Sequence, residues 1–387
     1  MRSRTSPTRS TASSSITPDV HSLALPLLIG LIAVALAFDF LNGLHDAANS
    51  IATVVGTRLI GPVAAVGFAA FFNFAAYFLA LKWPSLHNVA ETIGKGLIDK
   101  DLVTPAVVFG ALVGAMFWNI VTWVKGLPSS SSHALVGGII GAGVAHAGFP
   151  SIQWIGLNKT LIAIVLSPVL GLLLTMLIML ATSWLGVRAS ARGAERVFRG
   201  LHLFSAGAYS LGHGLNDAQK TMGVITVLLY STGYLAGQFA VPHWVALSCY
   251  VAMGIGTLTG GWRIIETMGT RITKLNQHQG FSASLGGSIM LFAASYLGIP
   301  VSTTHTIAGC VIGAGTARRA SAVRWGLAGD VAIAWIITIP ASALVAALFY
   351  WLISGLFIRV LVVLAAVGII AYAARAWVAR SSAAATP

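Results

Sequence analysis

The chain carries the same set of short polar motifs twice, in the same order, within otherwise apolar sequence. The three pairs are a Gly-Leu-x-Asp-Ala core at residues 43–47 and 214–218, a Glu-Thr-x-Gly motif at 91–94 and 266–269, and a Pro-led hydroxyl cluster at 128–133 and 300–305. The members of these pairs are 171, 175 and 172 positions apart. Three ordered pairs at nearly one offset indicate that the chain consists of two copies of one unit.

The composition places both copies in a membrane. Hydrophobic residues make up 57% of the chain and charged residues 9%, with a mean hydropathy of +0.85, whereas soluble domains carry about 25% charged residues. Because a spanning helix needs about 20 apolar residues, the long apolar runs predict an all-α, polytopic membrane protein with about 10 to 12 transmembrane helices, including re-entrant or broken helices. Duplicated polar interruptions in such a protein are typical of a transporter.

The charge distribution predicts the segment boundaries and the topology. The net charge of +13 arises partly from an arginine-rich stretch between the copies and from arginines after the second hydroxyl cluster; both are predicted to be cytoplasmic. We find no soluble domain or aromatic and basic platform for nucleic acid. The expected segments are a disordered Arg/Ser-rich tail at 1–22, a first repeat at 23–186, a basic cytoplasmic linker at 187–200, a second repeat at 201–356, and a C-terminal helix and tail at 357–387.

The two motif aspartates, Asp46 and Asp217, are each flanked by long apolar sequence. A carboxylate near the bilayer centre costs roughly 2.5 to 3.5 kcal/mol on insertion scales, so it normally faces a polar cavity, an ion or a partner. A location in a surface loop is the alternative. Two aspartates at equivalent positions favour the functional interpretation.

The hydroxyl clusters predict an anion site at two helix N-termini. Pro128 and Pro300 suit the first turn of a helix, and the glycine-rich runs that follow permit close helix packing. Backbone N–H groups and the hydroxyls of 129–132 and 302–304 would then surround an anion. The alternative is that these hydroxyls only cap the helices.

Other polar and reactive residues have simpler interpretations. We expect the histidines that end the hydroxyl clusters, His133 and His305, to bond to backbone or to aspartate rather than to bind a metal. Glu91 and Glu266 suit capping or ion pairing at least as well as transport. Two cysteines, at 249 and 310, lie in apolar sequence without a CxxC pattern and are predicted to be packing residues.

In these motifs the chain resembles the inorganic phosphate transporter (Pit) family, in particular its bacterial low-affinity members. The resemblance rests on residues 42–58, 128–133, 212–225 and 300–305. It implies two inverted-topology repeats and a homodimeric inner-membrane symporter that moves inorganic phosphate with H+ or Na+. The implied substrate-binding residues are Asp46, Asn49, Ser130, Ser131, Ser132, Asp217, Ser302, Thr303 and Thr304. To these we add Lys220, which departs from the family's pattern.

Two departures from the family's sodium-type pattern bear on ion coupling. His45 replaces the first Asn of the motif, and Lys220 replaces the later Asn of the second copy. We hypothesise that the Lys220 ammonium substitutes for one sodium ion and that His45 helps couple transport to protons, since histidine ordinarily titrates near pH 6.5. The ion-coupling set is His45, Asp46, Asn49, Asp217 and Lys220. Asp46 and Asn49 are the candidate ligands for Na+, and no other cofactor is expected.

The sequence leaves four alternatives open. Sulfate is the runner-up substrate, and phosphate could travel as a complex with a divalent metal. A passive channel would not accumulate the anion. In a different class, a membrane-embedded lipid phosphatase could use Ser131, His133 and Asp46 as nucleophile, base and orienting group. Because a catalytic triad does not require duplication, the repeat favours a transporter over an enzyme.

Overall fold

The computed structural model describes residues 23–188, 190–235 and 239–355, together with residues 366 and 369. The predicted tail at 1–22 and nearly all of the predicted C-terminal segment at 357–387 lie outside the described residues. Within them, the α-helices are α1 (Leu25–Gly56), α2 (Pro62–Lys82), α3 (Asn88–Lys95), α4 (Pro105–Lys125), α5 (Ser131–Ala147), α6 (Trp154–Leu185), α7 (Ala191–Ser231), α8 (His243–Thr259), α9 (Trp262–Glu266), α10 (Gln277–Leu297), α11 (Thr303–Arg318) and α12 (Trp325–Ser354).

The helices confirm the prediction of an all-helical, polytopic membrane protein. Six of those described are long and apolar enough to cross a bilayer, namely α1, α2, α4, α6, α10 and α12. A seventh span results if α8 and the following segment at 264–271, which are bent by 77° relative to one another, form one broken crossing. The helices that begin in the hydroxyl clusters, α5 and α11, have only 17 and 16 residues.

The two aspartate motifs interrupt the apolar sequence but not the helices. Helix α1 continues for 32 residues through Asp46, and α7 continues for 41 residues through Asp217. An unbroken helix satisfies its own backbone hydrogen bonds, which is what a segment inside a membrane requires. The free helix ends near the site therefore belong to α5 and α11 rather than to the helices that carry the aspartates.

The two copies are interleaved in the bundle. Helix α5 packs along α12 and α11 packs along α6, while α1 packs along α8 and α7 packs along α2. Each of these pairs takes one helix from each copy. A side chain at Gly141 would overlap the backbone of Ala343 on α12, and one at Gly313 would overlap the backbone of Leu172 on α6. This confirms that the glycine-rich runs permit close packing of helices.

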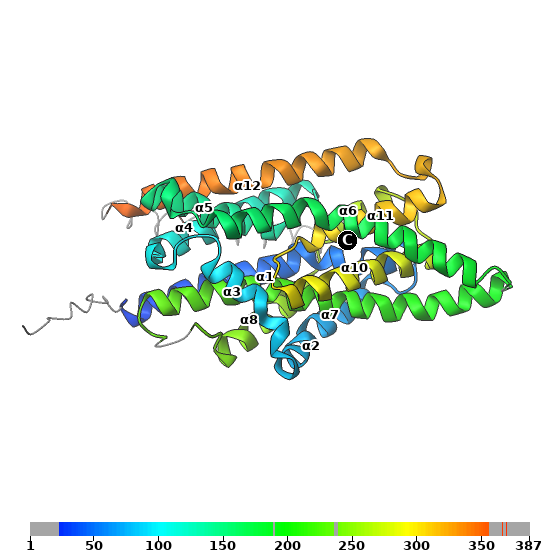
Figure 1. The fold of residues 1–387 in the computed structure, drawn as a ribbon, viewed down its shortest axis with the longest axis horizontal. Helices are drawn as coiled ribbons and strands as arrows, with labels where there is room; N and C mark the ends of the chain where they lie inside the picture. The colour runs from blue at the N-terminus through cyan, green and yellow to red at the C-terminus, as the bar shows by residue number, and fades with distance from the viewer. Residues whose placement is uncertain (1–22, 189, 236–238, 356–365, 367–368, 370–387) are drawn as a thin grey trace, which may run out of the picture.

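The equivalent helices α5 and α11 run in opposite directions. Helices α5 and α11 begin next to one another, since the rings of His133 and His305 in their first turns are 4.1 Å apart, and they extend toward opposite ends of the bundle (Figure 1). The α6–α7 and α11–α12 connections lie at the same end (Figure 1), as the positive-inside prediction for both arginine-rich segments requires. The predicted linker is largely helical, because α7 begins at Ala191 with Ser190 as its N-cap.

The duplicated glutamates lie away from the interior. Glu91 on α3 pairs with Lys95 at 2.9 Å, and Glu266 at the end of α9 pairs with Arg271 at 2.8 Å. Both glutamates are exposed, so the ion-pair interpretation is confirmed. The two cysteines, at 249 and 310, are free and buried, as expected of packing residues.

Candidate functional site

The aspartates of the two motifs are buried, and each accepts a hydrogen bond from the hydroxyl cluster of its own copy. Asp46 is 1% exposed and Asp217 is 0% exposed. The Ser131 hydroxyl donates to Oδ2 of Asp46 at 2.9 Å, and the Thr303 hydroxyl donates to Oδ2 of Asp217 at 3.0 Å. Because Ser131 and Thr303 are the first residues of α5 and α11, both short helices direct their N-termini toward a carboxylate.

Three residues after each aspartate, a side chain reaches across to the other copy. Asn49 Nδ2 donates to the Thr304 hydroxyl at 2.9 Å, and the Lys220 ammonium donates to the Ser132 hydroxyl. Asn49 and Lys220 occupy equivalent positions, and so do Ser132 and Thr304. Reciprocal contacts between equivalent positions are what a two-fold relation produces. The structure thus brings residues from all four motif segments into one cluster.

Two of the predicted site hydroxyls are helix caps. The Ser130 hydroxyl accepts from the backbone N–H of His133 at 3.2 Å, and the Ser302 hydroxyl accepts from that of His305 at 3.1 Å. The capping alternative therefore holds for these two serines. The expectation that the prolines occupy the first helical turn is wrong, because Pro128 precedes α5 and the equivalent proline precedes α11. Further N–H groups of each first turn have no partner within their own helix.

In the first copy, Asp46 lies beside a histidine. His45 Nδ1 is 2.7 Å from Asp46 Oδ1, and His45 Nε2 is 3.2 Å from the Thr122 hydroxyl. Ser129 donates to the same Thr122 hydroxyl at 2.8 Å. A chain of groups that can exchange protons therefore connects Asp46 to α4.

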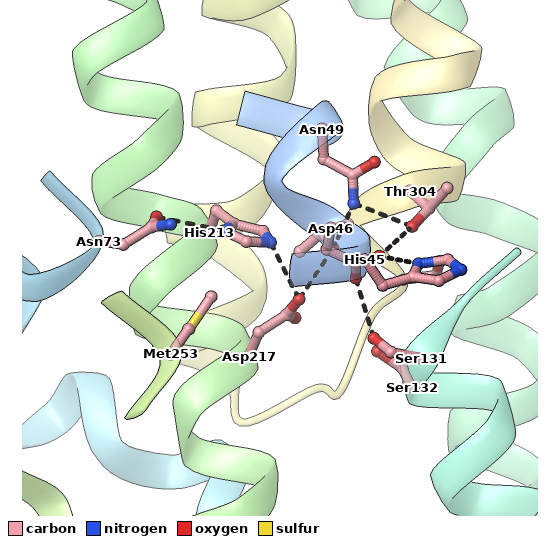
Figure 2. Close-up of polar contacts among 12 residues, drawn as sticks. His45, Asp46, Asn49, Asn73, Ser131, Ser132, His213, Asp217, Met253 and Thr304 are labelled. Carbon is pink, nitrogen blue, oxygen red and sulfur yellow. Dashed lines mark hydrogen bonds and ion pairs between the residues drawn. The ribbon is translucent and has the colours of Figure 1, made fainter. Parts of the chain in front are cut away.

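In the second copy, the carboxylate already has a cationic partner. Lys220 forms a buried ion pair with Asp217 and also donates to the backbone carbonyl of Val301 at 3.0 Å. His213 Nε2 lies 3.2 Å from Asp217 Oδ2, and His213 Nδ1 is 3.1 Å from Asn73 Oδ1 (Figure 2). Asp217 is thus neutralised by a fixed side chain, unlike Asp46.

The histidines at the ends of the hydroxyl clusters pack against one another. The rings of His133 and His305 meet edge to face at 4.1 Å, and His305 also stacks on Trp335 at 3.8 Å. Backbone groups of Trp335 and Ile164 lie at the rings of His133 and His305, respectively, and neither ring bonds to an aspartate within the part of the chain that the structure describes. Of the two expected partners, the contact is therefore with the backbone and not with aspartate. Ser131 donates to Asp46 rather than to His133, and the serine–histidine contact of a lipid phosphatase is missing among these residues.

One group of side chains has the geometry to hold a cation. Ligand atoms of Asp46, His213 and Asp217 all lie within 4.8 Å of one another. The Lys220 ammonium already forms an ion pair with the Asp217 carboxylate, which disfavours binding of a metal cation at the same carboxylate. Asn49 has a buried amide oxygen without a hydrogen-bond partner, so oxygen ligands of the kind that Na+ accepts are present at Asp46 and Asn49, the pair predicted for it.

Sequence reasoning missed several polar residues of the interior. They are Asp39, Asn73, Thr122 and His213, all at most 2% exposed. A signal was available for Asp39, because Asp39, Asn42, Asp46, Asn49 and Thr53 recur every three or four residues and therefore share one face of a helix. No local pattern marks Asn73 or Thr122, which reach the site only through helix packing.

The architecture and the site together define a class of protein. An all-helical bundle that spans a membrane, with a buried polar and charged cluster where two interleaved copies meet, is a membrane transporter. The family comparison agrees, since residues 42–346 match the model of the phosphate transporter family. This chain belongs to that family, and it is a transporter rather than an enzyme.

Individual relatives are similar over nearly their whole length. A probable low-affinity inorganic phosphate transporter of Rhizobium meliloti is 62% identical, with 85% of this chain and 97% of the relative covered. One from Bacillus subtilis is 38% identical, with 87% and 99% covered. Among solved structures, the sodium-dependent phosphate transporter matches with a TM-score of 0.75 at 25% identity, covering 85% of this chain and 99% of the other. The apolar helices and these bacterial relatives identify an integral protein of the inner membrane.

Proposed function

We propose that this protein is a secondary active symporter that moves inorganic phosphate across the membrane together with protons. The observation that carries the proposal is the ring of hydroxyl, amide and ammonium donors around Asp46 and Asp217, closed by the N-termini of α5 and α11. Helix N-termini with hydroxyl side chains form an anion site without requiring a large fixed charge. The proposed substrate-binding set is the one predicted from the sequence without Ser130 and Ser302, whose hydroxyls cap α5 and α11.

Phosphate is favoured over sulfate on chemical grounds. Near neutral pH phosphate retains a proton and can donate it to a carboxylate, whereas sulfate cannot, and the ring contains two buried carboxylates. Several relatives are described as low-affinity inorganic phosphate transporters, which supports the same substrate. A neutral complex of phosphate with a divalent metal would also suit a buried site, because it carries less net charge.

Proton coupling is favoured by the two positions at which the copies differ. The ammonium of Lys220 pairs with Asp217 and so supplies the positive charge that a sodium ion would otherwise bring. His45 contacts Asp46 directly and belongs to the residue type that changes charge between pH 5 and 8. Sodium remains the alternative ion, at Asp46 and Asn49, since the structurally similar transporter is sodium-dependent.

The proposed mechanism is alternating access between two inverted-topology repeats. Support comes from the reciprocal contacts of Asn49 and Lys220 and from the opposite directions of α5 and α11 (Figure 1). All ten residues of the set predicted from the sequence are at most 5% exposed, so helix movement is needed to admit the anion from either side. We further propose that two copies of the chain form a homodimer in the bilayer.

The decisive experiment measures uptake of labelled phosphate into liposomes that contain the purified protein. Proton and sodium gradients are imposed separately, and sulfate is added as a competitor. We expect accumulation driven by an inward proton gradient, with weak competition by sulfate. Stimulation by sodium alone would overturn the coupling ion, stronger competition by sulfate would overturn the substrate, and failure to accumulate the anion against its gradient would indicate a channel.

A further inference from the structure

A third buried carboxylate lies outside the cluster described above. Asp39 is 0% exposed and precedes Asp46 by seven residues on α1. Seven residues are two helical turns, or about 10 Å along the axis, so both carboxylates lie on the same side of α1. Asn42 lies between them and is 1% exposed.

The surroundings of Asp39 are polar but uncharged. The Asn42 amide, the Thr221 hydroxyl and the Cys249 thiol are the side-chain hydrogen-bonding groups at its carboxylate. Their contacts with the two carboxylate oxygens fall short of full hydrogen-bond geometry. Three neutral neighbours do not offset the charge of a buried carboxylate.

The charge around Asp39 supports the same conclusion. The ionisable groups that interact with its carboxylate are the Asp217 carboxylate on α7 and the Cys249 thiol on α8. The Tyr250 hydroxyl on α8 is also close enough to interact electrostatically with Asp39. None of these is a cation, and no ion pair involves Asp39 in the described residues. Taking an isolated carboxylate out of water is very costly. Asp39 therefore requires neutralisation by a bound positive charge.

We propose that Asp39, with Asn42 and Thr221, forms a proton-binding site separate from the phosphate site, and that its proton is carried with phosphate. This inference rests on the proposed transport function. In the binding step a hydronium ion transfers a proton to one carboxylate oxygen and leaves a water molecule, and the resulting O–H group donates a hydrogen bond to Asn42 Oδ1 or Thr221 Oγ1. In the release step the O–H bond breaks and the proton returns to water on the other side.

The donor set favours a proton over a metal cation. A hard cation such as Na+ requires several oxygen ligands and does not select thiols. Cys249 closes one side of the site, which leaves the carboxylate with the single oxygens of Asn42 and Thr221. A carboxylic acid needs only one acceptor.

The site is present in one copy only. The residue equivalent to Asp39 in the second copy is Ser210, whose hydroxyl donates to the carbonyl of Ala206 in its own helix at 3.0 Å. Thr221, in turn, is equivalent to Ser50 of the first copy. The two copies therefore provide one site for an ionisable group and one matched position without it, which supplies an internal control.

The test separates transport of phosphate from its coupling to protons. Asp39→Asn is compared with Ser210→Ala and with the unsubstituted protein in liposomes. One assay measures exchange of external labelled phosphate for internal unlabelled phosphate, with no gradient. The other measures accumulation driven by an inward gradient of one pH unit, which gives about a tenfold phosphate ratio for each coupled proton. Melting temperature in detergent confirms that each variant is folded.

We expect Asp39→Asn to retain exchange and to lose accumulation, while Ser210→Ala retains both. Partial accumulation by Asp39→Glu would support a carboxyl group as the carrier. Accumulation by Asp39→Asn equal to that of the unsubstituted protein would overturn the proposal, as would loss of exchange together with accumulation in a folded variant. If Asp39→Asn instead lost only the phosphate accumulation that an inward sodium gradient drives, the site would be assigned to a metal cation. Absence of phosphate transport in the unsubstituted protein would refute the proposed function itself, whatever the variants do.

Discussion

The two motif aspartates occupy equivalent positions but have different electrostatic surroundings. Asp217 is paired with the ammonium of Lys220, and His213 lies beside it. Asp46 instead contacts His45 and is followed one turn later by the uncharged Asn49. Both carboxylates nevertheless accept a hydrogen bond from the hydroxyl of the first residue of a short helix.

The two halves of the site therefore differ in the charge they present to an ion. Asp217 has a permanent cationic partner, whereas Asp46 lies beside a histidine and an amide and has no fixed cation. The scaffold is duplicated, but the charge is not. The proposed ion coupling therefore belongs to the first copy, and the second copy provides a constant background for the anion.

The largest effect is expected from removing the fixed cation. Lys220→Met leaves Asp217 buried without its partner, which costs about 3 to 5 kcal/mol of stability, and phosphate uptake should be abolished. The double variant with Asp217→Asn should recover stability but not uptake. Thermal melting and liposome uptake check both results. A single variant as stable as the unsubstituted protein would show that the ion pair does not neutralise Asp217.

A second change makes the first copy resemble the second. His45→Asn removes the histidine that contacts Asp46 and introduces the residue found at the equivalent position, Asn216. We expect binding of phosphate to persist and the rate of uptake to depend less on pH between pH 5 and 8, where histidine ordinarily changes charge. Initial rates measured across that range test this. An unchanged pH profile would remove His45 from the coupling mechanism.

A smaller effect should separate a binding hydroxyl from a capping hydroxyl on the same helix. Ser130→Ala removes an N-cap and should lower stability by about 1 kcal/mol with little change in apparent phosphate affinity. Ser131→Ala removes the hydrogen bond to Asp46 and should weaken phosphate affinity more than stability. Substrate-dependent uptake rates and melting curves, measured on both variants, distinguish the two. Equal effects on affinity would mean that both serines serve the same purpose.

The smallest effect is expected at the third duplicated motif. Glu91→Gln and Glu266→Gln each remove one exposed ion pair, and exposed pairs contribute about 0 to 1 kcal/mol. Uptake should remain close to that of the unsubstituted protein. Loss of uptake in either variant would show that duplication of this motif reflects transport rather than shared ancestry of the copies.

Much of the architecture could be predicted because membrane residence constrains the backbone strongly. Long apolar runs must be helices in lipid, and the glycine-rich runs correctly indicated close packing. The residues at which the helices begin and end were harder to predict from the sequence. Polar residues around Asp46 suggested a broken helix, yet α1 continues through them, because side-chain polarity inside a protein does not interrupt backbone hydrogen bonding. The prolines likewise lie before α5 and α11 and not in their first turns.

The candidate site was predictable where residues recur in both copies and hidden where they occur once. Asp46, Asp217 and the hydroxyl clusters are duplicated, and the structure brings them together. Asp39, Thr122 and Asn73 are not duplicated in the other copy, and their importance comes from neighbours on other helices. Asn73, for example, is on α2 and reaches the site by contacting His213 on α7.

The sequence alone determined that the chain is a duplicated, all-helical membrane protein whose ionisable residues are concentrated in two equivalent motifs. Composition and motif spacing suffice for that. The bilayer allows few backbone structures, and a duplication appears as a nearly constant sequence separation between paired motifs. Only the tertiary structure decided which partner each charge has. Lys220 reaches Ser132 of the other copy, and Asp39 faces Thr221 without an ion pair in the described residues. Such partners are set by the packing of helices far apart in sequence, and electrostatic energies depend on those distances and on burial.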